Sequence, residues 1–245
     1  GGNSSAISGY STGGYHPVKS NIIDKFPFAA DGNATDVGDL TIVLLGHASQ
    51  SSSEHGYSSG GYGGTGSPRV GAQKIISKFA FASDGNAAQT GFTTGTYSNW
   101  TTGHNSLTNG YQNGGAYAPK ANSIYKFPFA SDANATQVAT LVTTGQDRAG
   151  SNSPEYGYVA SGTDTINIEK HSFTSDTNAT TVGALTVSRQ GLRGNSSTSF
   201  GYSAGGRLSP SMRDVIDKFP FAADGNATDV GNLTVGLRWL TTQQI

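Results

Sequence analysis

The chain has 245 residues and no cysteine, so it forms no disulfide and offers no thiolate nucleophile or thiolate zinc site. Only 13% of the residues are charged and the net charge is −1, which leaves no basic field for nucleic acid and no acidic field for cations. The run closest to a hydrophobic segment, residues 40–45, is far shorter than a membrane span. We therefore expect no nucleic-acid partner and no membrane insertion.

The residues that are abundant form an internal repeat. Glycine occurs 35 times, and 10% aromatic residues indicate a packed core. A Gly-Tyr pair begins each unit, a Gly-Gly pair follows in four of the five, and a Lys-Phe-x-Phe-like segment precedes an Asp-x-Asn-Ala turn. The lysines of the five segments, separated by 53, 48, 44 and 48 residues, are Lys25, Lys78, Lys126, Lys170 and Lys218.

The repeat predicts an all-β fold. Each unit of about 48 residues consists of short segments with alternating apolar residues, separated by Gly, Asn and Asp, which is typical of a small antiparallel sheet. Five such units predict a five-bladed β-propeller. We expect the Gly-Tyr segment to be an inner strand, Lys-Phe-x-Phe a middle strand whose aromatic rings fill the space between blades, and the following Thr-x-Val-Gly segment the outer strand.

We interpret residues 1–245 as a single propeller domain. The expected blades span residues 3–45, 46–98, 99–146, 147–190 and 191–245. Asn3-Ser4-Ser5 aligns with Asn195-Ser196-Ser197, each just before a Gly-Tyr pair, whereas Arg238-Trp239-Leu240 departs from the repeat. We expect this last segment to contact the first blade and close a single ring; the alternative is that the chain was cut from a longer array.

Length variation is confined to one loop of each unit. The lysine lies 31 or 32 residues before the next Gly-Tyr, but 13 to 22 residues after its own. Repeat proteins carry insertions on one face, which is often the binding face. The expected variable loops are residues 15–21, 62–74, 116–123, 163–167 and 207–215. The candidate ligand-binding residues in these loops are Tyr15, His16, Tyr62, Arg69, Tyr117 and Arg207.

The Asp-x-Asn-Ala turn has three interpretations. A calcium loop would need more carboxylates than the middle copies provide. Glycosylation fits the Asn-Ala-Thr sequons but not the second copy, which keeps Asn86 and loses the threonine. We favour a structural hairpin turn, because Asp bonds nearby backbone and Asn tolerates a left-handed conformation. The turn residues are Asp31, Asn33, Asp84, Asn86, Asp132, Asn134, Asp176, Asn178, Asp224 and Asn226.

The segments Gly-Tyr-Ser-x-Gly-Gly, Ile-Ile-Asp-Lys-Phe-Pro-Phe-Ala and Asp-Gly-Asn-Ala-Thr-Asp-Val-Gly-Asp-Leu-Thr together resemble a kelch-like β-propeller repeat. They also resemble a repeat found in virion- and tail-associated proteins of aquatic bacteriophages and in environmental viral sequences. The resemblance spans about residues 9–235 and implies a propeller on a virus particle.

Little in the sequence indicates catalysis. The five histidines occupy unlike repeat positions, and no nucleophile-elbow, phosphate-loop or zinc motif occurs, so we expect no enzyme, no metal and no cofactor. The five repeated lysines suggest either a ring-shaped anion site or solvated side chains paired with the turn aspartates. Further candidates for stacking against a sugar are Tyr97, Trp100 and Trp239.

These observations lead to a functional hypothesis. We expect a non-enzymatic viral structural or recognition module at the virion surface, outside the cell, that binds a host-surface glycan or protein through the variable loops. One alternative is a purely architectural virion decoration domain without a ligand. The other is a hydrolase of surface polysaccharide, which a pair of carboxylates in one pocket would favour.

Overall fold

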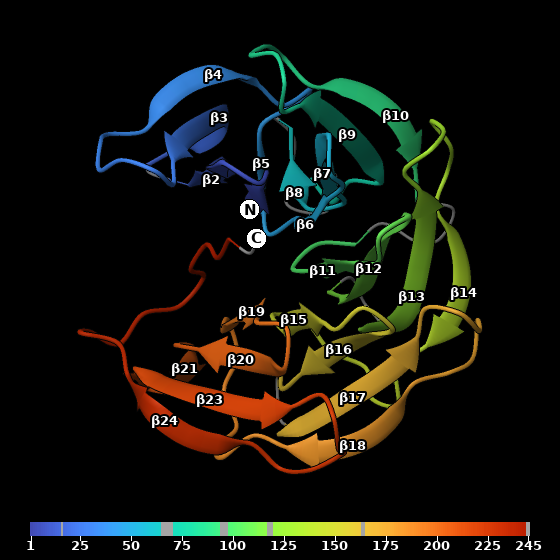
Figure 1. Cartoon of the computed structure of the whole chain (residues 1–245), viewed down its shortest axis with the longest axis vertical. Coiled ribbons are helices and arrows are strands. Elements are labelled where there is room, and N and C mark those ends of the chain that lie inside the picture. Colours follow the sequence, from blue (N-terminus) through green and yellow to red (C-terminus); the bar gives the residue numbers. More distant parts are fainter. Residues whose placement is uncertain (16, 65–70, 94–97, 117–119, 163–164, 244–245) are drawn as a thin grey trace.

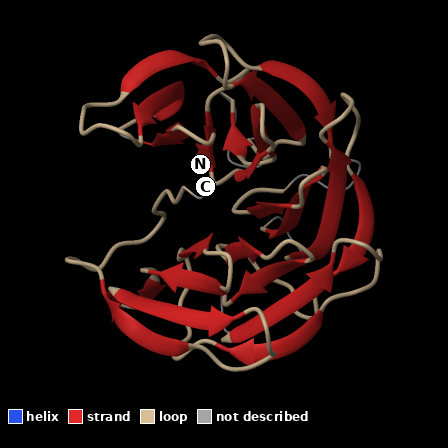
Figure 2. Ribbon diagram, viewed as in Figure 1, coloured by secondary structure: helices blue, strands red, loops and turns tan. Residues whose placement is uncertain are grey.

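The described secondary structure consists of strands alone, arranged as a five-bladed β-propeller (Figures 1 and 2). The computed structural model describes residues 1–15, 17–64, 71–93, 98–116, 120–162 and 165–243. None of the described residues forms a helix that is long and apolar enough to cross a membrane. The predicted fold class is therefore confirmed.

Each blade is a four-stranded antiparallel sheet. From the axis outward, the first blade contains β1 (Gly2–Ser4), β2 (Ser8–Tyr15), β3 (Lys19–Pro27) and β4 (Thr35–Asp39). The second contains β6 (Ala48–Ser51), β7 (His55–Ser59), β9 (Ile75–Ala80) and β10 (Ala88–Phe92). The third contains β11 (Thr102–Asn105), β12 (Asn109–Gly115), β13 (Ala121–Pro128) and β14 (Thr136–Thr140).

The last two blades repeat this order. The fourth contains β15 (Ala149–Asn152), β16 (Tyr156–Ala160), β17 (Asn167–Ser172) and β18 (Thr180–Ala184). The fifth contains β19 (Arg193–Ser196), β20 (Phe200–Ala204), β23 (Val215–Pro220) and β24 (Thr228–Asn232). Two small ribbons accompany the variable loops: β5 (Leu44–Leu45) pairs with β8 (Tyr62–Gly63), and β21 (Arg207–Leu208) pairs with β22 (Ser211–Met212).

The innermost strand of each blade precedes the Gly-Tyr segment, which forms the second strand. The innermost strands are short and polar, so their sequences give no apolar alternation. They are nevertheless buried or half-buried, and their side chains bond the backbone of the next blade: Asn3 Nδ2 donates to Gln50 O at 2.7 Å and to Tyr57 O at 3.1 Å. A polar strand can line the axis when its polar groups are paired in this way.

Aromatic side chains fill the space between adjacent blades, as predicted. The tyrosine of each second strand stacks on the second aromatic ring of the next blade's Lys-Phe-x-Phe segment, with centroids 4.8–4.9 Å apart. The stacked pairs are Tyr10 with Phe81, Tyr57 with Phe129, Tyr111 with Phe173, and Tyr158 with Phe221. These rings lie at the centre of four separate hydrophobic clusters, so the core is distributed between the blades.

The Asp-x-Asn-Ala turns join the third strand to the outer strand, and their side chains bond the preceding blade. Lysine Nζ donates to Asp Oδ1 at 2.5–3.0 Å in four pairs: Lys25 with Asp84, Lys78 with Asp132, Lys126 with Asp176, and Lys170 with Asp224. The ring of free ammonium groups is therefore not formed, because these four lysines are neutralised by the next blade.

The turn asparagines make a second contact between blades. The amide oxygen of Asn86 accepts the backbone N–H of Asp39 at 2.9 Å, and the Ala87 N–H donates to Asp39 O at 2.7 Å. The same two bonds recur at Asn134 with Ala135, Asn178 with Ala179, and Asn226 with Ala227. This need for an amide oxygen explains why Asn86 is present in the copy that lacks a sequon.

Within the part of the chain that the structure describes, the ring is closed only at its innermost layer. Figure 1 shows the C-terminal segment crossing from the fifth blade to the axis, close to the N-terminus, while the outer strands β4 and β24 stay apart. Gln243 Nε2 donates to Tyr10 O of the first blade at 3.2 Å. The expected contact with the first blade is thus made by Gln243, whereas Trp239 bonds the backbone of Gly191 and the side chain of Asp147.

Candidate functional site

The two ends of the propeller differ in chemistry. In every blade the first two strands are joined by a short turn, such as residues 5–7, and the Asp-x-Asn-Ala turn lies at the same end. We call this end the turn face. The variable loops join the second strand to the third at the opposite end, which we call the loop face. Because all five blades have the same strand order around the axis, the five variable loops share the loop face.

The sequence-predicted ligand residues have different environments. Tyr15 ends β2 and is 68% exposed. Tyr62 lies in β8, where Lys19 Nζ sits 4.0 Å from its ring centroid and donates to Gly64 O at 3.1 Å. Arg207, in β21, donates to Ser209 Oγ at 3.4 Å. The predictions for His16, Arg69 and Tyr117 lie outside the described residues, as does that for Tyr97.

The first and second loops approach each other, and the fifth stands apart. Lys19 pairs with Tyr15 across β2 and β3, and its ammonium group covers the Tyr62 ring, so Tyr15 and Tyr62 flank one lysine. Among the described residues, no hydrogen bond, ion pair or ring contact joins Arg207 to Tyr15 or Tyr62. The structure thus brings together two of the predicted residues.

An aromatic cluster lies at the axis on the loop face. Trp100 and Trp239 stack with their ring centroids 5.0 Å apart and an interplanar angle of 21°. The Arg238 guanidinium lies 3.8 Å from the Trp239 ring centroid, and Trp239 Nε1 donates to Asp147 Oδ1 at 3.0 Å. Burial raises the pKa of Asp147 above its usual value, although this carboxylate accepts the indole bond. Trp239 itself stays 43% exposed.

The position of the two tryptophans is set by the backbone. Both have a left-handed conformation, with φ of 55° at Trp100 and 59° at Trp239, as do Gly46, Asp147 and Gly191 at the corresponding places of the other connections. A chain of backbone bonds joins these residues: Trp239 N donates to Gly191 O, Gly191 N to Asp147 O, and Asp147 N to Trp100 O. The sequence signal that would have paired them is Trp-x-Thr, present at 100–102 and again at 239–241.

A cavity of about 540 Å³ runs along the axis. Its walls are the innermost strands, and it extends to the turn face, where residues such as Ser5, Ser52 and Ser106 line it. No residue of the variable loops is among its described lining residues. This cavity was not predicted from the sequence, because the strands that line it were not recognised.

The cavity wall carries several polar side chains and, among the described residues, no acid. Its described lining residues include Asn3, His47, Ser49 and Arg193 but no Asp or Glu. Burial lowers the pKa of His47 well below 6.5, so its imidazole is neutral at pH 7. Three buried wall atoms, Asn3 Oδ1, His47 Nδ1 and Ser49 Oγ, have no hydrogen-bond partner among the described residues. Such a wall suits water or a small neutral polar ligand.

Two buried histidines, one in the third blade and one in the fourth, stand at repeat positions where the other blades have other residues. His171, for example, stands where the other four blades have phenylalanine. His104 Nε2 and His171 Nε2 lie 2.7 Å apart, so one of them donates to the other. Burial lowers the pKa of His171 from 6.5 to about 4, and that of His104 well below 6.5. Among the described residues, no group of three His, Asp or Glu side chains is arranged to bind a metal ion.

Comparison of the chain with protein-family models and with curated protein sequences finds no match. The structure agrees with a kelch-like repeat fold, since five antiparallel four-stranded sheets surround one axis. The functional interpretation therefore depends on the two faces of this propeller.

Proposed function

We propose that the protein is a non-enzymatic recognition module that binds a host-surface glycan or protein through its loop face. The observation that carries the proposal is the exposure of large apolar side chains on variable loops of three blades. These residues are Tyr15, Val18, Ile166, Leu208 and Met212. Apolar groups that differ from blade to blade on one face are typical of a binding surface.

The rest of the loop face supports the same role. The stacked pair of Trp100 and Trp239 lies at its centre, and the indole of Trp239 is fixed by Asp147 and Arg238. Aromatic and arginine side chains held rigidly at the centre of a surface are frequent anchors for partners. The repeated contacts between blades provide the rigid scaffold that holds the loops.

Binding is favoured over hydrolysis by the chemistry of the axial cavity. Glycoside hydrolysis ordinarily uses two carboxyl groups that flank the scissile bond. The described residues that line the cavity include none. The location on a virus particle, outside the cell, is part of the proposal and rests on the resemblance of the repeat to virion- and tail-associated repeats.

The test is binding of the labelled protein to a broad glycan array and to a panel of cell-surface proteins. The variant Tyr15→Ser with Val18→Ser removes two exposed apolar side chains from the loop face. The matched control, Ile7→Ser with Leu107→Ser, removes two side chains from the turn face that are even more exposed, at 74% and 91%. We expect a selective signal that falls at least tenfold in the first variant and is unchanged in the control. A folded protein that binds nothing, or a signal lost only in the turn-face control, would favour the architectural role or the other face.

A further inference from the structure

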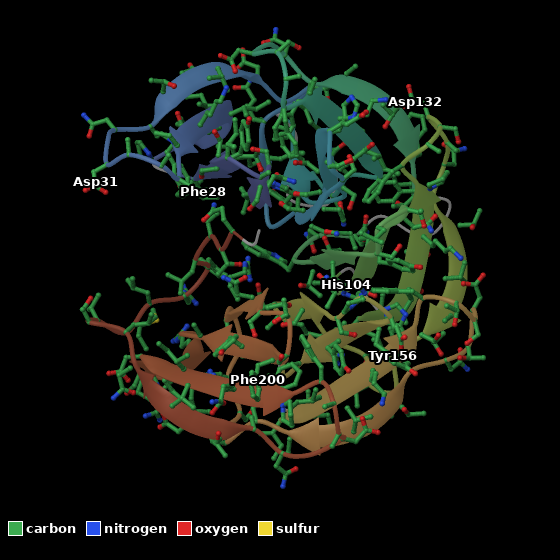
Figure 3. All side chains as sticks on the ribbon, viewed as in Figure 1. Phe28, Asp31, His104, Asp132, Tyr156 and Phe200 are labelled. Atoms are coloured by element: carbon green, nitrogen blue, oxygen red, sulfur yellow. The ribbon has the colours of Figure 1, made fainter. Side chains whose placement is uncertain are left out.

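The fifth blade and the first blade present edges that make none of the repeated contacts. We call the space between β23 and β24 on one side and β3 and β4 on the other the seam. Figure 3 labels Phe28 and Asp31 on the first blade, where they face this opening. Among the described residues, no hydrogen bond, ion pair or ring contact joins these two pairs of strands.

The first blade carries an unused set of the groups that contact a preceding blade. Asp31, Asn33 and Ala34 correspond to Asp84, Asn86 and Ala87, yet none of the three makes the bonds that its counterpart makes. Phe28 corresponds to Phe81, which stacks on Tyr10, but Phe28 is 38% exposed, and among the described residues its one ring contact is with Phe26 of its own strand.

The fifth blade has the complementary unused set. Among the described residues, Tyr202, which corresponds to Tyr10 and Tyr158, makes no ring contact with another blade, and Lys218 has no carboxylate partner and lies over Phe200. A Cβ built on Gly38, Gly91 or Gly183 would clash with the backbone of the next blade's turn. At Gly231, the corresponding residue of the fifth blade, nothing lies within 4 Å.

The C-terminal segment follows the path of a sixth connection. Trp239 has the left-handed conformation of the four earlier connections and bonds Gly191 in the same way. Asn195 Nδ2 donates to Gln243 O at 2.9 Å, as Asn3 Nδ2 donates to Gln50 O, and Gln243 Nε2 donates to Tyr10 O, as Gln50 Nε2 donates to Tyr111 O. Residues 241–243 therefore occupy the place of a sixth innermost strand, with no second strand beside them.

We propose that the seam is the binding place for one further unit of this repeat, which enters directly after the C-terminal segment and supplies the second, third and outer strands of a sixth blade. Its aromatic pair would pack on Tyr202 and its turn Asp would bind Lys218. On its other side its tyrosine would stack on Phe28, its lysine would bind Asp31, and its outer strand would bond Asn33 and Ala34. Both edges match the four interfaces already formed, so one further repeat unit would continue the same contacts around the ring.

The test extends the chain with its own repeat. Residues 1–244 are followed by a copy of residues 197–232, because residue 244 corresponds to Ser196. The control extension carries the same copy with Ser at the positions of Phe219 and Phe221. We expect the first extension to raise the thermal midpoint of the whole protein by several degrees and the control extension to leave it unchanged. An equal midpoint for both extensions would overturn the proposal.

A pair of substitutions makes the result specific to the seam. Asn33→Ala should leave the midpoint of the original chain unchanged and lower that of the extended chain by about 2–4 °C, because only the extension provides an N–H for Asn33. Asn86→Ala should lower the midpoint in both. If Asn33→Ala has no effect in the extended chain, the unit does not occupy the seam. The original, unextended protein could instead be a dimer at the concentration used, with its midpoint lowered by Asn33→Ala. In that case a second copy of the chain occupies the seam, and the proposal is wrong.

Discussion

Four boundaries between blades are closed by one set of contacts, and the fifth is not. At the closed boundaries a tyrosine stacks on a phenylalanine, a lysine binds an aspartate, and an asparagine and an alanine bond one stretch of outer-strand backbone. The same residue types stand on both sides of the seam, where, among the described residues, they have no partner across it. The comparison shows that the repeated residues mainly form contacts between adjacent blades. Their contribution to stability therefore depends on whether a neighbouring blade is present to supply the partner.

The largest difference in stability between a closed boundary and the seam should come from removing the aspartate that precedes the repeated lysine. Asp217 accepts from Arg189 at 2.8 Å and from Thr186 Oγ1 at 2.6 Å, and both Arg189 and Asp217 are fully buried. Asp217→Ala leaves the buried guanidinium without its carboxylate, with hydrogen bonds to backbone carbonyls such as Ser203 O remaining, which should cost about 3–5 kcal/mol of unfolding free energy. Asp24 has the same position in the first blade and faces the seam, so Asp24→Ala should cost less than about 0.5 kcal/mol. Urea unfolding measures both, and equal losses would contradict the comparison.

Acid should weaken the boundary between the third and fourth blades. The pKa of His171 is about 4 in the folded protein and near 6.5 in the unfolded chain, so the unfolded state binds the proton first. Stability is therefore complete above pH 6.5 and falls as the pH drops toward 4, by at most about 1.4 kcal/mol per pH unit for each such histidine.

The double variant His104→Asn with His171→Phe restores the residue types of the other blades and isolates this effect. Its unfolding free energy should fall less steeply between pH 6.5 and 4, with the remaining slope due partly to the buried His47. Denaturant unfolding across this pH range gives the two slopes. Identical slopes would show that the histidine pair does not stay neutral in the folded protein.

The turn asparagines should give a smaller contrast. Asn86→Ala removes the acceptor of the Asp39 N–H and should cost about 1 kcal/mol, whereas Asn33→Ala removes no bond and should cost less than about 0.3 kcal/mol. Chemical unfolding of the two variants under one condition provides the measurement. A loss at Asn33 as large as that at Asn86 would mean that the seam is already occupied.

The exposed ion pairs should give the smallest contrast. Asp132→Asn weakens a pair whose Nζ to Oδ1 distance is 2.5 Å but whose carboxylate is more than half exposed, so we expect a loss of about 0.2–1 kcal/mol that shrinks at high salt. Asp31→Asn should produce no measurable change at any salt concentration. A loss at Asp132 that does not depend on salt would indicate that the aspartate acts through the turn conformation instead.

The sequence predicted the five blades, because the repeat of about 48 residues gives their number and the alternating apolar residues indicate the strands within each one. It did not predict the innermost strands, since residues such as Asn3 and Gln50 become buried only when a neighbouring blade supplies their acceptors. It placed Asp84 and Asn86 correctly in a turn, and one of its two interpretations paired the repeated lysines with the turn aspartates, as Lys25 and Asp84 do. It assigned the bonding of Asn86 to the turn itself, whereas the partner of Asn86, the Asp39 N–H, belongs to the preceding blade. These partners depend on which blades become neighbours around the axis, and the sequence of a single repeat does not contain that information.

The loop face was predicted in part. Tyr15 is exposed beside the variable loop, as a binding residue must be, and Tyr62 is partly covered by Lys19. The stacking of Trp100 on Trp239 joins residues 139 positions apart and depends on the path of the C-terminal segment, and the Trp-x-Thr pattern that the two places share was not used to predict it. The binding function of this face stays a prediction.

The central claim is that the four closed boundaries and the seam differ in bonding although their sequences repeat. Native-state hydrogen exchange at the five equivalent alanine amides tests it without a mutation. We predict slow exchange at Ala87, Ala135, Ala179 and Ala227, whose N–H groups bond the preceding outer strand at 2.7–2.9 Å, and fast exchange at Ala34. Protection of Ala34 equal to that of the other four would contradict the account.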